Sequence, residues 1–207
     1  MKKVYLDIQM VKHRSYKVSH FIVSIKTDDY IGNYRDVDTF VVYCKECNRY
    51  NACWSCPPFD FDMEEYIFPY KIAYIIGTKI ILDTDVIREN TGLELCNKAA
   101  YNIVEEVRLS LDRKLLEMET VFPGSKAFFG GTCHICPLGE CTRIKGKPCI
   151  KPDKVRPSLE AFGFDITKTS SELLNIEMKW SNNGVLPEYF TLVSGFFTSK
   201  EIPLTLR

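Results

Sequence analysis

The sequence predicts an α+β protein in which helices pack on a mixed sheet and two cysteine-rich loops lie at strand ends. Two observations predict this class. Runs rich in β-branched and aromatic residues recur along the chain, and one long segment repeats its apolar residues with helical spacing. The chain contains no repeat, low-complexity tract or linker. We therefore expect residues 1–207 to form one compact domain.

The predicted strands are short apolar runs with strand-forming side chains. One run leads directly into the first group of cysteines, and another reaches the second group through the turn residues Gly130-Gly131. The predicted bounds are 4–11, 38–43, 71–82, 126–129 and 188–198.

The clearest helix is predicted over 94–119, where apolar side chains recur at i, i+3 and i+4. Pro123-Gly124 is expected to end it. A short helix is predicted over 62–68, a helical turn over 158–162, and a further helix over 170–178 capped by Thr169 or Ser170.

The composition excludes several classes of partner. Lys and Arg number 27, as do Asp and Glu, so the formal net charge is zero. No net field draws such a protein to nucleic acid or to an anionic membrane, and we expect neither as a partner. The first residues lack an apolar run of signal-peptide length, which predicts a cytoplasmic protein. Cysteine patterns in a reducing compartment more often indicate metal binding or catalysis than disulfides.

Eight of the nine cysteines fall into two groups of four, the number that closes a tetrahedral zinc site or ligates an iron–sulfur cluster. Cys96 stands apart on the predicted long helix, where a small buried hydrophobe is expected. The first group has the spacing C-x2-C-x5-C-x2-C and the second C-x2-C-x4-C-x7-C. The predicted metal ligands are Cys44, Cys47, Cys53, Cys56, Cys133, Cys136, Cys141 and Cys149.

The spacing leaves the metal open. Zinc knuckles are usually separated by a longer loop than the five residues between Cys47 and Cys53. The second group is closer to a stretched ferredoxin run, which favours iron–sulfur clusters of the 4Fe–4S type, with zinc as the alternative. The two groups could also exchange ligands, as in two-cluster ferredoxins. His134, between two cysteines, could substitute as a ligand, although four thiols already complete a shell.

Together these residues resemble an uncharacterised cysteine-rich family of predicted metal-binding proteins from anaerobic bacteria and archaea. After C-x2-C…C-x2-CPP, the matching positions are Gly130-Gly131, Cys133, Cys136, Cys141, Pro148-Cys149, Pro152, Arg156-Pro157-Ser158, Glu160-Ala161 and Gly163. The chain departs from the family pattern by four residues, rather than two, before Cys141, and by Ile150 in place of a basic residue. The resemblance implies metal binding, most plausibly iron–sulfur, and no established reaction.

Arg156 is expected near the second group, where its guanidinium would stabilise a negatively charged metal site. It could instead pair with Glu160 across one helical turn and only hold the loop.

The leading hypothesis is an electron-transfer or accessory protein with two cysteine-ligated clusters that passes electrons to a redox partner protein. Tyr50, Trp54 and Phe59 would shield the first cluster from water. The alternatives are a zinc-stabilised interaction module and an enzyme with an open-site cluster.

Overall fold

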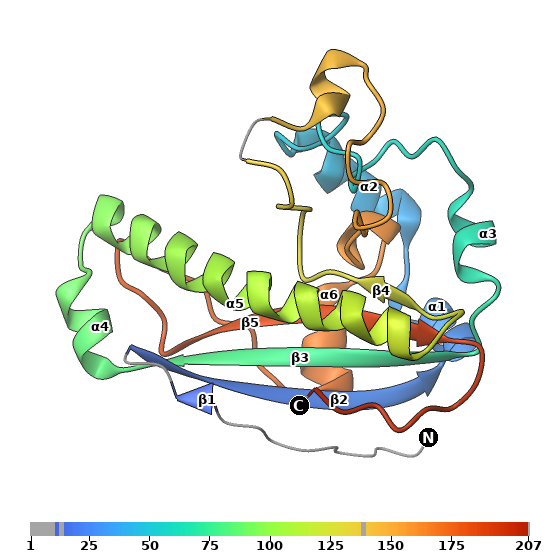
Figure 1. The fold of residues 1–207 in the computed structure, drawn as a ribbon. Coiled ribbons are helices and arrows are strands. Elements are labelled where there is room, and N and C mark those ends of the chain that lie inside the picture. The colour runs from blue at the N-terminus through green and yellow to red at the C-terminus, as the bar shows by residue number, and fades with distance from the viewer. Residues whose placement is uncertain (1–10, 13–14, 138–139, 207) are drawn as a thin grey trace.

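The computed structural model describes residues 11–12, 15–137 and 140–206 (Figure 1). Strands and helices follow one another without a regular alternation. The strands are β1 (Val11–Lys12), β2 (Tyr16–Lys26), β3 (Ile72–Leu82), β4 (Lys126–Phe128) and β5 (Tyr189–Thr198). The helices are α1 (Thr27–Tyr34), α2 (Val37–Glu46), α3 (Met63–Ile67), α4 (Thr84–Glu89), α5 (Leu93–Val121), α6 (Ile166–Lys168), the 3-10 turns η1 (Thr142–Lys145) and η2 (Glu160–Phe162), and the π-helical turn η3 (Thr169–Leu173).

The strands form one sheet in the order β1-β2-β3-β5-β4. The predicted α+β class is confirmed, but each pairing between these strands is antiparallel, so the expected mixed sheet is wrong. β3 lies at the centre and pairs along its length with β2 and β5. Its sequence, IAYIIGTKIIL, is almost continuously apolar because both faces of the sheet are covered.

The two faces of β3 belong to different hydrophobic clusters. Tyr74 and Ile76 face α5, where Leu111 and Leu115 pack against them. Ala73 and Ile75 face the opposite side, which is filled by aromatic side chains and by residues of η2, α6 and η3. The period-two alternation of a strand therefore places helices on both faces of the sheet, and α5 runs along one of them (Figure 1).

Several predicted elements are confirmed. The helix expected over 62–68 is α3, which Asp62 caps by accepting from the amides of Glu64 and Glu65. The long helix, the strand 71–82 and the last strand match α5, β3 and β5 within three residues. β4 and the turn η2 also lie where they were expected.

The predicted strand 38–43 is wrong, because these residues belong to helix α2. Their β-branched and aromatic side chains suggest a strand, but Asp36 accepts a hydrogen bond from the Thr39 amide at 3.0 Å and caps a helix. Asp38 in its first turn and Lys45 in its last turn suit the helix dipole. The first group of cysteines therefore begins in the last turn of a helix and does not follow a strand.

The helix predicted over 170–178 is also misplaced. Asp165 caps the segment by accepting from the Lys168 amide at 2.8 Å, so helical structure starts at Ile166 and ends after Leu173. The prediction for 4–11 lies outside the described residues except at Val11, which belongs to β1. β2, which no prediction covered, is one of the two longest strands.

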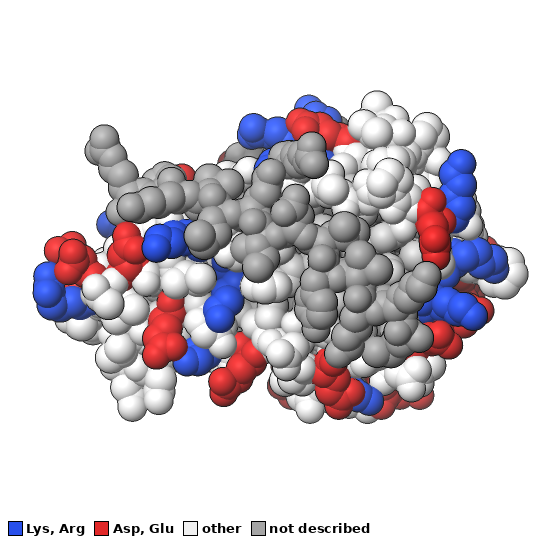
Figure 2. Space-filling model, turned by 90° about the horizontal axis from the view of Figure 1, so that it is seen from below, with Lys and Arg blue, Asp and Glu red and all other residues white. Residues whose placement is uncertain are grey.

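The cysteine-rich segments form a separate layer, which we call the cysteine lobe and define as residues 44–58, 130–137 and 140–152. In Figure 1 it lies above the sheet, beyond the yellow strand β4 and beside α5. Figure 2 shows the molecule from below, where acidic and basic side chains are interspersed among the described residues. This distribution agrees with the balanced composition.

Candidate metal centre

The first group of cysteines starts inside α2. Cys44 lies in the last turn of the helix, and Cys47 ends it by donating its amide to the Cys44 carbonyl at 3.1 Å. After a run of turns, the Cys56 amide bonds to the Cys53 carbonyl at 3.0 Å. Cys53 and Cys56 are buried, whereas Cys47 is exposed. The two C-x2-C pairs therefore occupy different surroundings.

The second group follows β4 through a glycine turn. Gly131 has φ +113°, and a Cβ there would lie 3.4 Å from the Arg108 guanidinium carbon. Glycine is favoured because it tolerates this backbone and leaves room for Arg108, which donates to the carbonyl of Thr132. α5 thereby fixes the start of the loop that carries Cys133 and Cys136.

The two groups meet in space although about 76 residues separate them. The Cys133 amide donates to Ser55 Oγ at 3.0 Å, and the Thr132 hydroxyl lies 3.7 Å from Cys56 Sγ. Arg143 of η1 donates to the carbonyls of Cys53 at 2.9 Å and Cys56 at 2.7 Å. One arginine of the second group therefore holds the backbone of the first.

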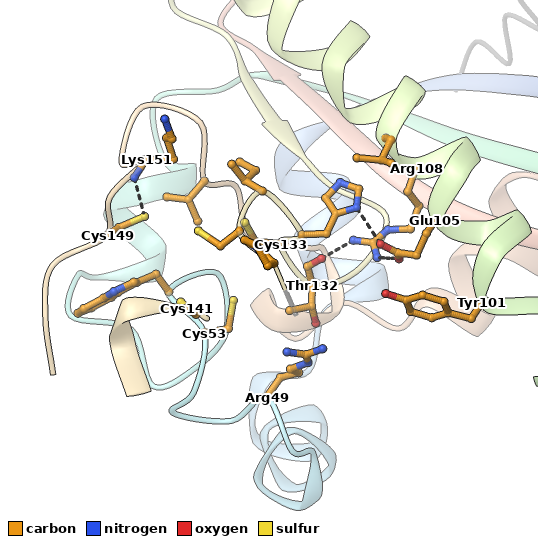
Figure 3. A pocket seen from close by; sticks show the side chains of 17 residues that line it. Arg49, Cys53, Tyr101, Glu105, Arg108, Thr132, Cys133, Cys141, Cys149 and Lys151 are labelled. Carbon is orange, nitrogen blue, oxygen red and sulfur yellow. Dashed lines mark hydrogen bonds and ion pairs between the residues drawn. The ribbon is translucent and has the colours of Figure 1, made fainter. Parts of the chain in front are cut away.

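A cavity of about 310 Å³ opens where the groups meet (Figure 3). Five cysteines from both groups line it, namely Cys53, Cys133, Cys136, Cys141 and Cys149. Tyr101, Glu105 and Arg108 of α5 form another part of its wall. Cys44 instead lines a second cavity, so the structure divides the first group between two places.

Three thiols interact beside this cavity: Cys53 and Cys56, which are buried, and Cys133, which is half-buried. Hydrogen bonds from Cys133 and Cys56 lower the pKa of the Cys53 thiol. The same bonds, together with burial, raise the pKa of Cys56 and of Cys133. One thiolate with two thiol donors is therefore favoured, and a thiolate is the form of cysteine that ligates a metal.

Other sulfurs accept backbone amides, as metal-bound thiolates do. The Lys151 amide lies 3.4 Å from Cys149 Sγ, and the Arg49 amide lies 3.5 Å from Cys47 Sγ. Within the described residues, however, no three Cys, His, Asp or Glu side chains converge closely enough to hold one metal ion. The donor set fits a cysteine-ligated group, and its sulfurs line a cavity rather than surround a point.

His134 takes part in an ionic network that its sequence position did not predict. Its Nδ1 lies 3.0 Å from Glu105 Oε2 and its Nε2 lies 2.8 Å from Asp112 Oδ2. The bond to Asp112 raises the pKa of His134 against the effect of burial, and Arg108 pairs with Glu105. Both ring nitrogens are engaged by carboxylates, which leaves no nitrogen free to ligate a metal.

Glu105, Arg108 and Asp112 were missed by the sequence analysis. A signal was present, because these residues are spaced at i, i+3 and i+7 and share a face of α5. Arg108 and Asp112 are buried beside the apolar stripe of the helix. Charged residues buried in this way are uncommon unless they are paired, and here they orient the loop of the second group.

Arg156 lies in a buried ion pair with Glu119 of α5. Its Nε donates to Glu119 Oε1 at 2.7 Å, and its Nη2 lies 2.5 Å from Glu119 Oε2. The alternative in which Arg156 pairs with Glu160 is wrong, because its partner is Glu119. Arg156 does not line the cysteine cavity, so its predicted contact with a cofactor gains no support and the loop-holding alternative fits its position.

The remaining expectations have mixed outcomes. Cys96 is confirmed as a buried hydrophobe on α5. Trp54 lines the cysteine cavity and donates to the Lys147 carbonyl at 3.1 Å, whereas Tyr50 and Phe59 line the second cavity. None of the described helices combines the length and apolar character needed to cross a bilayer.

The comparison with known families now adds to this geometry. A family model described as "Predicted metal-binding protein (DUF2284)" matches residues 31–194, which include both groups of cysteines. The chain belongs to this family. The expectation of metal binding is therefore supported, while the family description specifies neither a metal nor a reaction. No curated protein and no solved structure matches the chain.

Proposed function

We propose that this protein holds an iron–sulfur cluster in the cysteine cavity and transfers single electrons to a partner protein. One observation carries the proposal: five cysteines from two distant segments line one cavity of about 310 Å³. When bound, such a cluster supplies one-electron redox chemistry.

The size of the cavity favours a cluster over a single ion. Zinc lies about 2.3 Å from each thiolate, so the sulfurs of a zinc site leave no space between them. One water molecule occupies about 30 Å³ of liquid, and the cavity is roughly ten times larger. A bulky inorganic group with several sulfur ligands suits this space. Cys133, Cys136, Cys141 and Cys149 are the proposed ligands, and Cys53 is within reach of the same group.

The first group of cysteines could hold a second cluster. Cys44, Cys47, Cys53 and Cys56 remain candidate ligands of a second cluster, although the structure directs Cys44 and Cys53 to different cavities. The contact between Cys53 and Cys133 supports exchange of ligands between the groups. The iron content per chain distinguishes one shared cluster from two.

The surroundings of the cavity support electron transfer to a partner. Cys136, Cys141 and Cys149 are only half-buried, which places a bound cluster near the surface. Exposed lysines follow on the same loop, at positions 145, 147, 151 and 154, with Asp153 as the one acidic residue among them. This charge would favour an acidic surface on the redox partner.

A zinc-stabilised module is the second candidate, and a different observation favours it. Cys53 interacts directly with both Cys56 and Cys133, and Cys136 adds a fourth sulfur near Cys53. CWSC and CHIC would then be two C-x2-C knuckles that close one tetrahedral site. In that case the metal would supply folding energy and no redox chemistry.

The deciding experiment measures iron, zinc and acid-labile sulfide in protein purified without oxygen, with a visible spectrum of the same sample. We expect about four iron and four sulfide per bound cluster, together with broad absorption that changes on reduction. About one zinc per chain, no sulfide and no visible absorption would overturn the iron–sulfur proposal in favour of the zinc module.

A further inference from the structure

Ser55 lies between Cys53 and Cys56 in the first group of cysteines and is almost completely buried, with 1% of its surface exposed. Its hydroxyl oxygen lies 3.3 Å from Cys53 Sγ and 3.8 Å from Cys56 Sγ. The amide of Cys133, from the second group, lies 3.0 Å from the same oxygen. One buried hydroxyl therefore contacts both groups at the place where they meet.

The hydrogen bonds of Ser55 have a direction that follows from its partners. The Cys133 amide can only donate, so the hydroxyl oxygen accepts that bond and its single proton remains to be donated elsewhere. Two sulfurs are within reach, and Cys53 is the closer. The backbone amide of Ser55 bonds to Cys53 as well. Both donors of Ser55 are therefore directed to Cys53.

Metal binding would make these two donors more important. In the metal-free protein, the thiols of Cys56 and Cys133 also donate to Cys53. A cysteine that ligates a metal has lost its proton, so Cys133, as a ligand, would no longer donate. The hydroxyl and the amide of Ser55 keep their protons and continue to bond to the Cys53 sulfur.

We propose that Ser55 positions Cys53 as a ligand of the metal centre in the cysteine cavity and raises the reduction potential of that centre, an inference that rests on the proposed function. Cys53 and Cys133 both line the cavity (Figure 3), and Ser55 holds one by its sulfur and the other by its amide. Hydrogen bonds to ligating sulfurs are one of the means by which a protein sets the potential. They stabilise the reduced state more, because it carries more negative charge.

Thr132 provides the matched comparison. Its hydroxyl lies 3.7 Å from Cys56 Sγ, so it makes the same kind of contact with a different sulfur. Cys56 is not among the residues that line the cysteine cavity. Thr132→Val removes this hydroxyl and keeps the shape of the side chain. It therefore tests whether the effect belongs to Cys53 or to any hydroxyl near the cysteines.

The test is a redox titration followed by electron paramagnetic resonance, on protein purified without oxygen whose iron and sulfide have been counted. Ser55→Ala should keep its iron and become harder to reduce. We expect the equilibrium constant for reduction to fall about tenfold, which is about 59 mV for one electron. Ser55→Thr, which keeps a hydroxyl, should restore most of the potential. Thr132→Val should leave the potential unchanged.

Pulsed resonance spectra of the reduced protein in D2O provide a second measurement. A deuteron donated to a ligating sulfur should appear as a strongly coupled signal, and Ser55→Ala should lose one such signal. The absence of any coupled deuteron in the unaltered protein overturns the proposal without a variant.

The remaining outcomes separate this proposal from the proposed function. An unchanged potential in iron-loaded Ser55→Ala, or equal shifts in Ser55→Ala and Ser55→Thr, overturns the role of the Ser55 hydroxyl alone. A shift of the same size in Thr132→Val overturns the assignment to Cys53. Protein that contains no iron overturns the proposed function, and the role of Ser55 in setting a potential with it.

Discussion

The sheet and the cysteine lobe are stabilised by different means. The sheet is buried on both faces, and Ile75, Ile76 and Ile80 at its centre have no exposed surface. Each fully buried side chain of this kind contributes about 1.5–3 kcal/mol to the free energy of unfolding. In the lobe, none of the described residues from 131 to 152 is buried. This segment has no buried core of its own and depends on polar contacts, so a bound metal would stabilise it more than the sheet.

The largest expected effect is on the cysteine lobe and leaves the sheet intact. The double variant Cys133→Ser, Cys136→Ser should lose most of its bound metal and the order of the lobe, because metal binding and local folding are coupled. The sheet should persist. Metal analysis, limited proteolysis across 131–152 and far-UV circular dichroism check these outcomes.

Cys96→Ala is the matched control, since it removes a thiol buried in the core and no predicted ligand. It should retain full metal content. A double variant that loses the sheet together with the lobe would contradict the division.

The next effect concerns the buried ion pair between Glu119 of α5 and Arg156, which follows the lobe in the chain. Arg156→Met should lower the free energy of unfolding by about 3–5 kcal/mol, because it leaves Glu119 charged and buried. Adding Glu119→Gln removes the charge but keeps an acceptor for the Ala127 amide, so it should restore part of the loss. Urea denaturation of the metal-loaded protein measures both. A double variant no more stable than Arg156→Met would rule out the buried charge as the cause.

A substitution in the core tests the sheet alone. Leu115→Ala should lower the free energy of unfolding by about 2–5 kcal/mol, because Leu115 is fully buried between α5 and the sheet. Metal content per folded chain should not change. Leu109→Ala makes the same change on the same helix at a position that is 51% exposed, and it should cost less than about 0.5 kcal/mol. Equal losses at the two positions would mean that this face of α5 is not the one that packs.

The smallest expected effect is a pH dependence of the free energy of unfolding, caused by a histidine in the sheet. His20 on β2 lies 2.9 Å from Thr78 Oγ1, and burial, followed by the charge of Lys114, lowers its pKa from 6.5 to about 4. The unfolded chain therefore binds a proton that the folded chain excludes. Above pH 6.5, His20 makes its full contribution to the free energy of unfolding. This contribution decreases as the pH falls towards 4, and the free energy of unfolding is about 1.4 kcal/mol lower at pH 5.5 for this reason.

The measurement compares unfolding at pH 8 and pH 5.5 in the unaltered protein and in His20→Gln. The glutamine should remove this part of the pH dependence while keeping a hydrogen bond to Thr78. Identical pH dependence in the two proteins would show that His20 is not the titrating group.

The same difference in burial decides how well each region could be predicted from the sequence. Long elements with a strong period, such as α5 and β3, follow from local apolar spacing and were predicted within three residues. α2 was taken for a strand because its side chains suit one, and the cap at Asp36 outweighed that preference. No residue of α2 is buried, so its sequence does not need the apolar residues at i, i+3 and i+4 that identify a packed helix.

The candidate site was predictable in its chemistry and not in its arrangement. Eight cysteines could be selected from the sequence, but spacing along the chain divided them into two groups of four. The structure brings Cys53 to Cys133 through bonds made by Ser55 and Arg143, which no local pattern encodes. The carboxylates around His134 come from α5, and their role depends on where that helix lies against the loop.

The length of α5 makes this helix suitable as a frame for measuring where a bound metal lies. Its 29 residues form a rod about 44 Å long, anchored on the sheet and passing the cysteine cavity at Glu105 and Arg108. Leu95, Tyr101, Leu109 and Val121 are exposed at intervals along it. Spin labels at these four positions would form a ruler of known spacing, against which a paramagnetic metal could be located by distance alone.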